Sequence, residues 1–152
     1  MDGFVQSGLT GAGIGSLTGG ITGYKPAWLD KEIASTFTYG LYRSGYSHGN
    51  TTLYRAGALE RRHFGGHWST DAPTSIAQVR HEKAVLPVWP KGGTSPIDHA
   101  FRAEFKPGTT IYTGYAAPQT GLDGTVYSGG TNQTYIPDSY LQGEITGKWP
   151  LN

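Results

Sequence analysis

The chain has 152 residues and a mass of 16.3 kDa, a length typical of one domain that buries a core without disulfide support. Aromatic residues make up 12% and charged residues 15%, a balance that excludes a wholly disordered chain. The 12 Lys and Arg nearly balance the 11 Asp and Glu, and Cys is absent, so we expect no nucleic-acid partner held by a basic field, no disulfide and no thiolate metal site.

The first 23 residues are rich in glycine and contain one charged side chain, that of Asp2. Because glycine disfavours the interiors of helices and strands, this composition predicts a flexible linker over residues 1–23 and a folded domain over residues 24–152. No apolar run reaches the roughly 18 residues of a membrane span, and no signal-peptide pattern is present. We therefore expect no stable membrane insertion, and we expect the linker to join a larger delivery polypeptide.

Two short helices are predicted. Pro26 and the acidic side chains behind it favour a helix within residues 27–36. Residues 75–84 carry apolar or small side chains at helical spacing with charges between them, and Thr74 or Ser75 can cap the first turn.

Short strands dominate the remainder. Alternating or β-branched residues bounded by Gly and Pro predict strands over residues 51–57, 99–105, 109–117, 132–137 and 140–150. Residues 44–50 are typical of a turn, and residues 120–130 of a loop. The pattern predicts a small, strand-dominated α+β domain with its core over residues 51–137.

Metal and nucleophile motifs are weak in this chain. The histidines are His48, His63, His67, His81 and His99. His63 and His67 are four residues apart, but two glycines separate them, so a shared helical face and a metal site are not expected. No GxSxG nucleophile motif is present. A metal-independent ribonuclease that uses His63, His67 or His81 stays open, because residue types alone do not exclude it.

Residues 51–70 carry the most chemical information. Arg55 comes near the end of a predicted strand, and a guanidinium there can hold a phosphate through two parallel hydrogen bonds. The alternative for Arg55 is a surface salt bridge. Phe64 and Trp68 can stack on a flat ring, and Ser69 can hydrogen-bond an amide. The alternative for the two aromatic residues is packing in the core.

Four segments appear in an order and spacing that resemble a known toxin family. They are LYRAG (53–57), HEKAVLP (81–87), DHAFRAEFKP (98–107) and GYAAPQTGLDGTVYSGGTNQTYIP (114–137). Together they resemble the NAD glycohydrolase toxin domain of the tuberculosis necrotizing toxin family, over about two thirds of the chain. The resemblance implies a split β-sheet related to the ADP-ribosyltransferases, with NAD⁺ bound between the sheet halves.

The resemblance also implies roles for individual residues. Arg55 matches an Arg expected near the NAD⁺ phosphates. Phe64 or Trp68 matches an aromatic residue beside the nicotinamide. His99 and Gln133 match the remaining catalytic positions, with Gln133 orienting the ribose or the attacking water.

Three further positions concern substrate binding. Lys83 stands where the family has Arg, so the charge is kept but the planar fork is lost. The loop before Gln133 lacks the family's Trp-Phe pair, and Tyr127 is the expected replacement. A comparison with the ADP-ribosyltransferases aligns Ser69 with a serine of their motif and Gln133 with their last Glu. A neutral Gln at that position favours water over a macromolecule as the acceptor.

The implied function is hydrolysis of NAD⁺ or NADP⁺ to nicotinamide and ADP-ribose or its phosphate, with no metal and no further cofactor. The implied setting is a secreted or contact-delivered toxin that acts in the cytoplasm of a target cell. A cognate immunity protein that blocks the cleft is expected, since the enzyme would otherwise kill its producer. The alternatives are an ADP-ribosyltransferase that modifies protein or RNA, a ribonuclease toxin, and a β-rich binding module.

Overall fold

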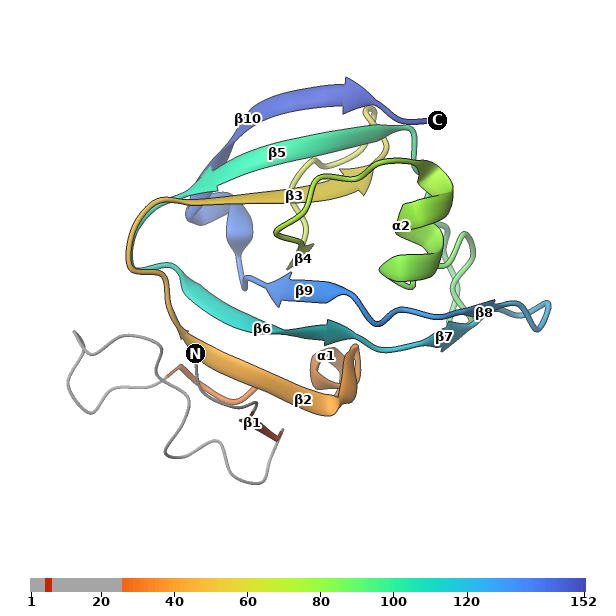
Figure 1. Ribbon diagram of the computed structural model, residues 1–152, viewed down its shortest axis with the longest axis horizontal. Helices are drawn as coiled ribbons and strands as arrows, with labels where there is room; N and C mark the ends of the chain where they lie inside the picture. The colour runs from red at the N-terminus through yellow and green to blue at the C-terminus, as the bar shows by residue number, and fades with distance from the viewer. Residues whose placement is uncertain (1–4, 7–25) are drawn as a thin grey trace.

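The computed structural model describes residues 5–6 and 26–152, which form two antiparallel sheets and a small ribbon (Figure 1). The larger sheet has the strand order β1-β2-β6-β9-β4, the smaller has the order β10-β5-β3, and β7 pairs with β8. The strands are β1 (Val5–Gln6), β2 (Phe37–Tyr46), β3 (Thr51–Gly57), β4 (His67–Trp68), β5 (His99–Phe105), β6 (Thr110–Ala116), β7 (Gln119–Thr120), β8 (Val126–Tyr127), β9 (Asn132–Tyr135) and β10 (Gly143–Pro150). The helices are α1 (Lys31–Ala34), α2 (Ile76–Glu82) and the 3₁₀ turn η2 (Ser139–Leu141). This arrangement confirms the predicted strand-dominated α+β fold with a split sheet.

The two sheets face each other across an apolar core. On β5, Phe101, Ala103 and Phe105 are buried because alternate residues of a strand point to the same face. Ala103 and Phe105 join a cluster that Trp68 of β4 completes from the larger sheet. The sheets are also joined directly, since Tyr54 of β3 exchanges two backbone hydrogen bonds of 2.8 Å with Ser69, just after β4.

The predicted helix near residue 80 is confirmed, and its cap is resolved. The Oγ of Ser75 accepts a hydrogen bond of 3.0 Å from the backbone N–H of Gln78 in the first turn of α2. This side chain satisfies one of the N–H groups that a helix leaves unpaired at its start. The first predicted helix is also present, but α1 occupies only Lys31–Ala34 of the predicted range 27–36.

The sequence-based assignment misses one long strand and one ribbon. The predicted turn over residues 44–50 is wrong for Ser44–Tyr46, which belong to β2. The sequence pattern does not reveal this strand because the strand contains a bulge. Tyr39 and Gly40 have φ angles of 57° and 67° and interrupt the regular alternation. The predicted loop over residues 120–130 contains part of the β7–β8 ribbon.

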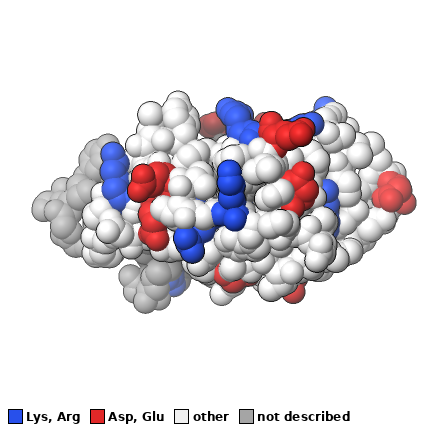
Figure 2. All heavy atoms as spheres, turned by 90° about the horizontal axis from the view of Figure 1, so that it is seen from above, with Lys and Arg blue, Asp and Glu red and all other residues white. Residues whose placement is uncertain are grey.

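The predicted linker over residues 1–23 lies outside the described residues except for Val5–Gln6, which pairs with β2. Among the described residues, no helix is long and apolar enough to cross a bilayer. Figure 2 shows acidic and basic side chains mixed across the face seen from above, with no continuous patch of one sign.

Candidate functional site

A cavity of about 220 Å³ is lined by residues of both sheets and of α2. Tyr54 and Ser69, whose backbones bridge β3 and the end of β4, are among them, and α2 contributes Gln78 and Val79. The polar and aromatic side chains that line the cavity are those of Thr36, Tyr54, Arg55, His67, Trp68, Ser69, Asp71, Gln78, Lys83, Trp89, Ser95, Gln119, Asn132 and Gln133.

Arg55 is a half-buried cation without an acidic partner among the described residues. Its Nη1 donates a 2.8 Å hydrogen bond to the carbonyl oxygen of His63, while its buried Nε has no hydrogen-bond partner. Burial lowers the pKa of Arg55 from its usual value, and the charge of Arg62 lowers it further. An unpaired buried charge is unfavourable, so this guanidinium is suited to receive an anion from the cavity.

Two neighbours, Trp68 and Gly65, lie close to this guanidinium. Its Cζ lies 5.7 Å from the ring centroid of Trp68, within the range of a cation–π contact. On Gly65, a Cβ would lie 2.7 Å from Nη2 of Arg55, so only glycine leaves space for the guanidinium there. Arg55 is therefore preorganised before any ligand arrives.

Gln133 lines the cavity and turns its amide nitrogen toward Thr36. Its Nε2 donates to the carbonyl oxygen of Thr36 at 3.2 Å and to Thr36 Oγ1 at 3.0 Å. A carbonyl oxygen accepts only, so the amide nitrogen must face Thr36 and the amide oxygen must point elsewhere. No hydrogen bond reaches Oε1 of Gln133 from the described part of the chain, so this oxygen is free to accept one from a ligand.

Thr36 also fixes the tautomer of His67. The Thr36 hydroxyl donates to the carbonyl oxygen of Ile33 at 2.7 Å, so its oxygen can only accept from Nε2 of His67 at 3.1 Å. His67 therefore carries its proton on Nε2, and no hydrogen bond from the described residues reaches the lone pair of Nδ1. Desolvation at the cavity, and after it the positive charge of Arg55, lower the pKa of His67 to about 4. The side chain still keeps exposed surface at the cavity.

The lowered pKa predicts a pH dependence of stability. Unfolded His67 takes up a proton near its ordinary pKa of 6.5, whereas folded His67 does so only near pH 4. We expect the thermal midpoint Tm to fall as pH drops from about 6.5 to about 4, because protonation favours the unfolded chain there. Thermal melts of the wild type and His67→Gln across this interval test the assignment. In the variant, Tm should change less with pH over this interval than in the wild type. An equal change of Tm with pH in both proteins would contradict the lowered pKa of His67.

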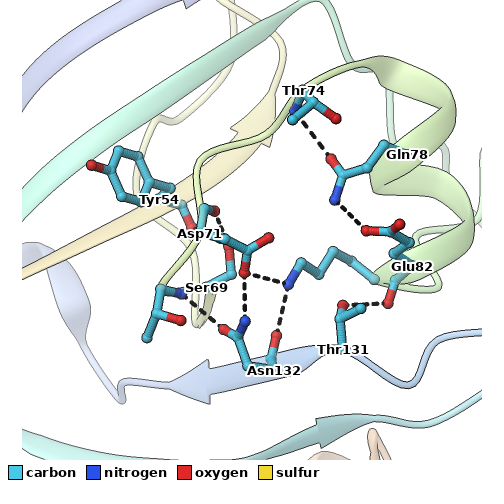
Figure 3. Close-up of polar contacts among 10 residues, drawn as sticks. Tyr54, Ser69, Asp71, Thr74, Gln78, Glu82, Thr131 and Asn132 are labelled. Carbon is cyan, nitrogen blue, oxygen red and sulfur yellow. Dashed lines mark hydrogen bonds and ion pairs between the residues drawn. The ribbon is translucent and has the colours of Figure 1, made fainter.

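A polar network ties the end of α2 to β9 (Figure 3). Lys83 Nζ forms an ion pair of 3.0 Å with Oδ1 of Asp71 and donates to the carbonyl oxygen of Asn132 at 2.9 Å. The side-chain amide of Asn132 donates to the same Oδ1, and its oxygen accepts from the backbone N–H of Thr70 at 2.8 Å. Burial alone would raise the pKa of Asp71, but the hydrogen bonds from Asn132 and Lys83 and the charge of Lys83 together lower it. Asp71 is thus ionised at neutral pH.

A short loop after α2 adds an aromatic residue to the cavity. Val88 and Thr94 pair across the loop, and Trp89, half-buried, lines the cavity. Lys91 at the tip lies 3.5 Å from Glu32 of α1, but both side chains are mostly exposed, so this ion pair contributes little to stability.

The structure brings together Arg55, Gln133, Trp68, Ser69 and Lys83 of the predicted site residues, since all five line the cavity. Within this set, the ammonium of Lys83 is already paired with Asp71, and the hydroxyl of Ser69 donates to the backbone of Asp71 at 2.8 Å. Trp68 is 2% exposed and belongs mainly to the core.

The other three predicted site residues lie outside the cavity lining. His99 pairs with Asp98 through a contact of 2.8 Å, and its ring stacks on Phe101. Phe64 packs edge-on against Trp68 at the core, and Tyr127 stacks on His81 beside α2.

Sequence reasoning missed three residues that shape the cavity. Thr36 is 97 residues from the Gln133 that it orients, so no local pattern could join them. Trp89 lies in a loop with no recognised motif. Asp71 lies directly after the stretch 51–70 that the sequence singles out, so the stretch ended one residue too early to include it.

The histidines considered for a ribonuclease are not assembled in one place. Only His67 lines the cavity, while His63 stacks on Phe101 and His81 stacks on Tyr127. Within the ranges 5–6 and 26–152, no group of three His, Cys, Asp or Glu side chains is placed to hold a metal ion.

Comparisons with known proteins show the fold and leave the family unassigned. No family model matches the chain, and no curated protein matches it. Among solved structures, a chain of Tne2 in complex with Tni2 is similar, with 17% identity, a TM-score of 0.57, and coverage of 72% of this chain and 92% of that one. A chain of Tse6 in complex with Tsi6 is also similar, with 10% identity, a TM-score of 0.54, and coverage of 77% and 80%. The chain thus shares its split-sheet fold with proteins from two solved complexes.

Proposed function

We propose that this chain is a toxin domain that hydrolyses NAD⁺ to nicotinamide and ADP-ribose. The observation that carries the proposal is Arg55, a preorganised cation without an acidic partner among the described residues, at the wall of a cavity between two sheet halves. A dinucleotide brings a diphosphate, and a guanidinium can bind it through two parallel hydrogen bonds. This placement agrees with the family resemblance of the sequence.

The proposed reaction breaks the bond between C1′ of the ribose and the nicotinamide nitrogen. The nicotinamide leaves with the bonding electrons as a neutral molecule, because its ring is cationic in NAD⁺. Water adds to C1′ and releases one proton. Since the leaving group needs no acid, the protein's work is to position the ribose and to stabilise positive charge on it.

The free acceptors of the site suit this task. Oε1 of Gln133 can accept a hydrogen bond from a hydroxyl of the nicotinamide ribose. Nδ1 of His67 can accept one from the attacking water. With a pKa of about 4, His67 orients that water rather than removing its proton in the ground state.

Trp89 is the better candidate for holding a flat ring of the substrate. The ring of Trp68 is almost fully buried and already contacts Arg55. Trp89 lies at the cavity on a short loop and keeps exposed surface for stacking. The site as proposed uses no metal and no cofactor beyond the NAD⁺ substrate.

A protein inhibitor is part of the proposal. Each of the two structural neighbours was solved in complex with a second protein, Tni2 or Tsi6. We propose that a cognate immunity protein covers the cavity here, and that a larger secreted or contact-dependent polypeptide delivers the domain to the cytoplasm of a target cell.

The purified chain incubated with NAD⁺, together with RNA and a protein mixture, tests the reaction class. We expect equal amounts of nicotinamide and free ADP-ribose, with intact RNA. ADP-ribose found mainly on protein or RNA would instead identify a transferase. Degraded RNA with unchanged NAD⁺ would identify a ribonuclease, and no change in either substrate would favour a binding module.

A further inference from the structure

We propose that Asp71 makes this cavity selective for NAD⁺ over NADP⁺ in two ways. Its carboxylate accepts a hydrogen bond from the 2′-hydroxyl of the adenosine ribose, and its ion pair with Lys83 prevents that ammonium from binding a 2′-phosphate. This inference rests on the proposed function and deepens it. It concerns the carboxylate of Asp71, the ammonium of Lys83 and the amide of Asn132, which form one network at the cavity wall (Figure 3).

The side chains that hold the carboxylate of Asp71 bind only one of its two oxygens. Oδ1 accepts hydrogen bonds from both the ammonium of Lys83 and the side-chain amide of Asn132. Within the described residues, no other side chain donates a hydrogen bond to Oδ2. The side chain is 46% exposed and lines the cavity. Oδ2 is therefore a fixed acceptor that a ribose hydroxyl can reach. In the Rossmann fold, which is unrelated to this one, an acidic residue accepts a hydrogen bond from the 2′-hydroxyl of NAD⁺, and the same chemistry is available to Oδ2 here.

The charged side chains that line the cavity disfavour binding of the 2′-phosphate of NADP⁺. Among the described lining residues, Arg55 and Lys83 are the permanently positive ones. Lys83 is only 14% exposed, and two of its three N–H groups are used by Asp71 and Asn132. Arg55 is therefore the only described lining cation not paired with a carboxylate, and the diphosphate common to both dinucleotides occupies it. A 2′-phosphate would add on the order of two negative charges beside an ionised carboxylate.

The acceptor assigned to the other ribose has a different anchor, although Gln133 follows Asn132 of the network on β9. Gln133 donates to Thr36, two residues after α1, whereas Asp71 is anchored to Lys83 at the end of α2. NAD⁺ carries one ribose on each side of its diphosphate. Gln133 and Asp71 give the cavity one ribose acceptor near each helix.

The test is the ratio of kcat/KM for NAD⁺ to kcat/KM for NADP⁺, measured for the wild type and three variants. The wild type should prefer NAD⁺ at least about tenfold, which corresponds to about 1.4 kcal/mol of differential binding. Asp71→Asn removes the carboxylate and releases Lys83, so the ratio should fall about tenfold, mainly through a lower KM for NADP⁺. Glu144→Gln removes an exposed acid from β10, outside the cavity, and should leave the ratio unchanged.

Lys83→Gln keeps the test decisive if Asp71→Asn does not fold. This variant leaves the charge of Asp71 without its cation, so the preference for NAD⁺ should increase. Equal use of both dinucleotides by the wild type, or an unchanged ratio in whichever variants fold, overturns the inference and leaves the hydrolase proposal standing. Failure to consume either dinucleotide overturns the hydrolase proposal itself.

Discussion

Arg55→Met is expected to lower the rate of NAD⁺ hydrolysis by about 10²–10³-fold, the usual effect of removing a preorganised donor from an active site. Methionine fills much of the same space but carries no charge for the diphosphate. The folded state should keep its Tm within a few degrees, because Arg55 has no acidic partner in the described chain whose loss would leave a buried charge. Steady-state kinetics and thermal melts of the same preparation measure both effects. A variant that keeps most of its activity would remove Arg55 from the site.

Two glycine variants test whether the position of the Arg55 guanidinium matters while the guanidinium itself is kept. Gly65→Ala places a methyl group 2.7 Å from Nη2 of Arg55 and must displace it, so we expect at least a tenfold loss of activity. Gly49→Ala adds the same methyl group where no atom lies within 4 Å, and it should leave activity unchanged. Equal activities in the two variants would show that the plane of the guanidinium does not matter.

Gln133→Glu is expected to lower activity about 10²–10³-fold and to lower Tm by several degrees. The carboxylate cannot donate a hydrogen bond, and one of its oxygens would face the carbonyl oxygen of Thr36, now 3.2 Å from Nε2. An unmade buried hydrogen bond costs about 1–3 kcal/mol. Gln133→Ala should lose similar activity, because it removes the ribose acceptor.

The matched control is Gln142→Glu, which makes the same change outside the cavity lining and should leave both activity and Tm nearly unchanged. If Gln133→Glu is as active as the wild type, the amide orientation derived from Thr36 is wrong.

Two strands of the smaller sheet could be predicted from local sequence patterns. Residues 99–105 match β5, where burial alternates from Phe101 to Phe105, and residues 51–57, a β-prone run that ends at a glycine, match β3. Strand β2 could not be predicted in this way, since its bulge at Tyr39 and Gly40 shifts the register against β6. A bulge is specified by contacts with the neighbouring strand, which a local pattern does not contain.

The candidate site was predictable only where the chain carries local chemistry. Arg55 and Gln133 follow from strand position and family resemblance, and both line the cavity. The orientation of Gln133 depends on Thr36, and the neutralisation of Lys83 depends on Asp71. These contacts arise from the meeting of two sheets and two helices, so no spacing in the sequence reveals them.

The most direct test of the central claim maps the binding site of an uncleavable NAD⁺ analogue, such as carba-NAD⁺, by amide and side-chain NMR of the full chain. The account predicts saturable shifts at Arg55, His67, Trp89 and Gln133 in the wild type, and loss of tight binding in Arg55→Met. Residues of β10 on the far edge of the smaller sheet should not move. Binding mapped to another surface, or unaltered binding by Arg55→Met, would contradict the account.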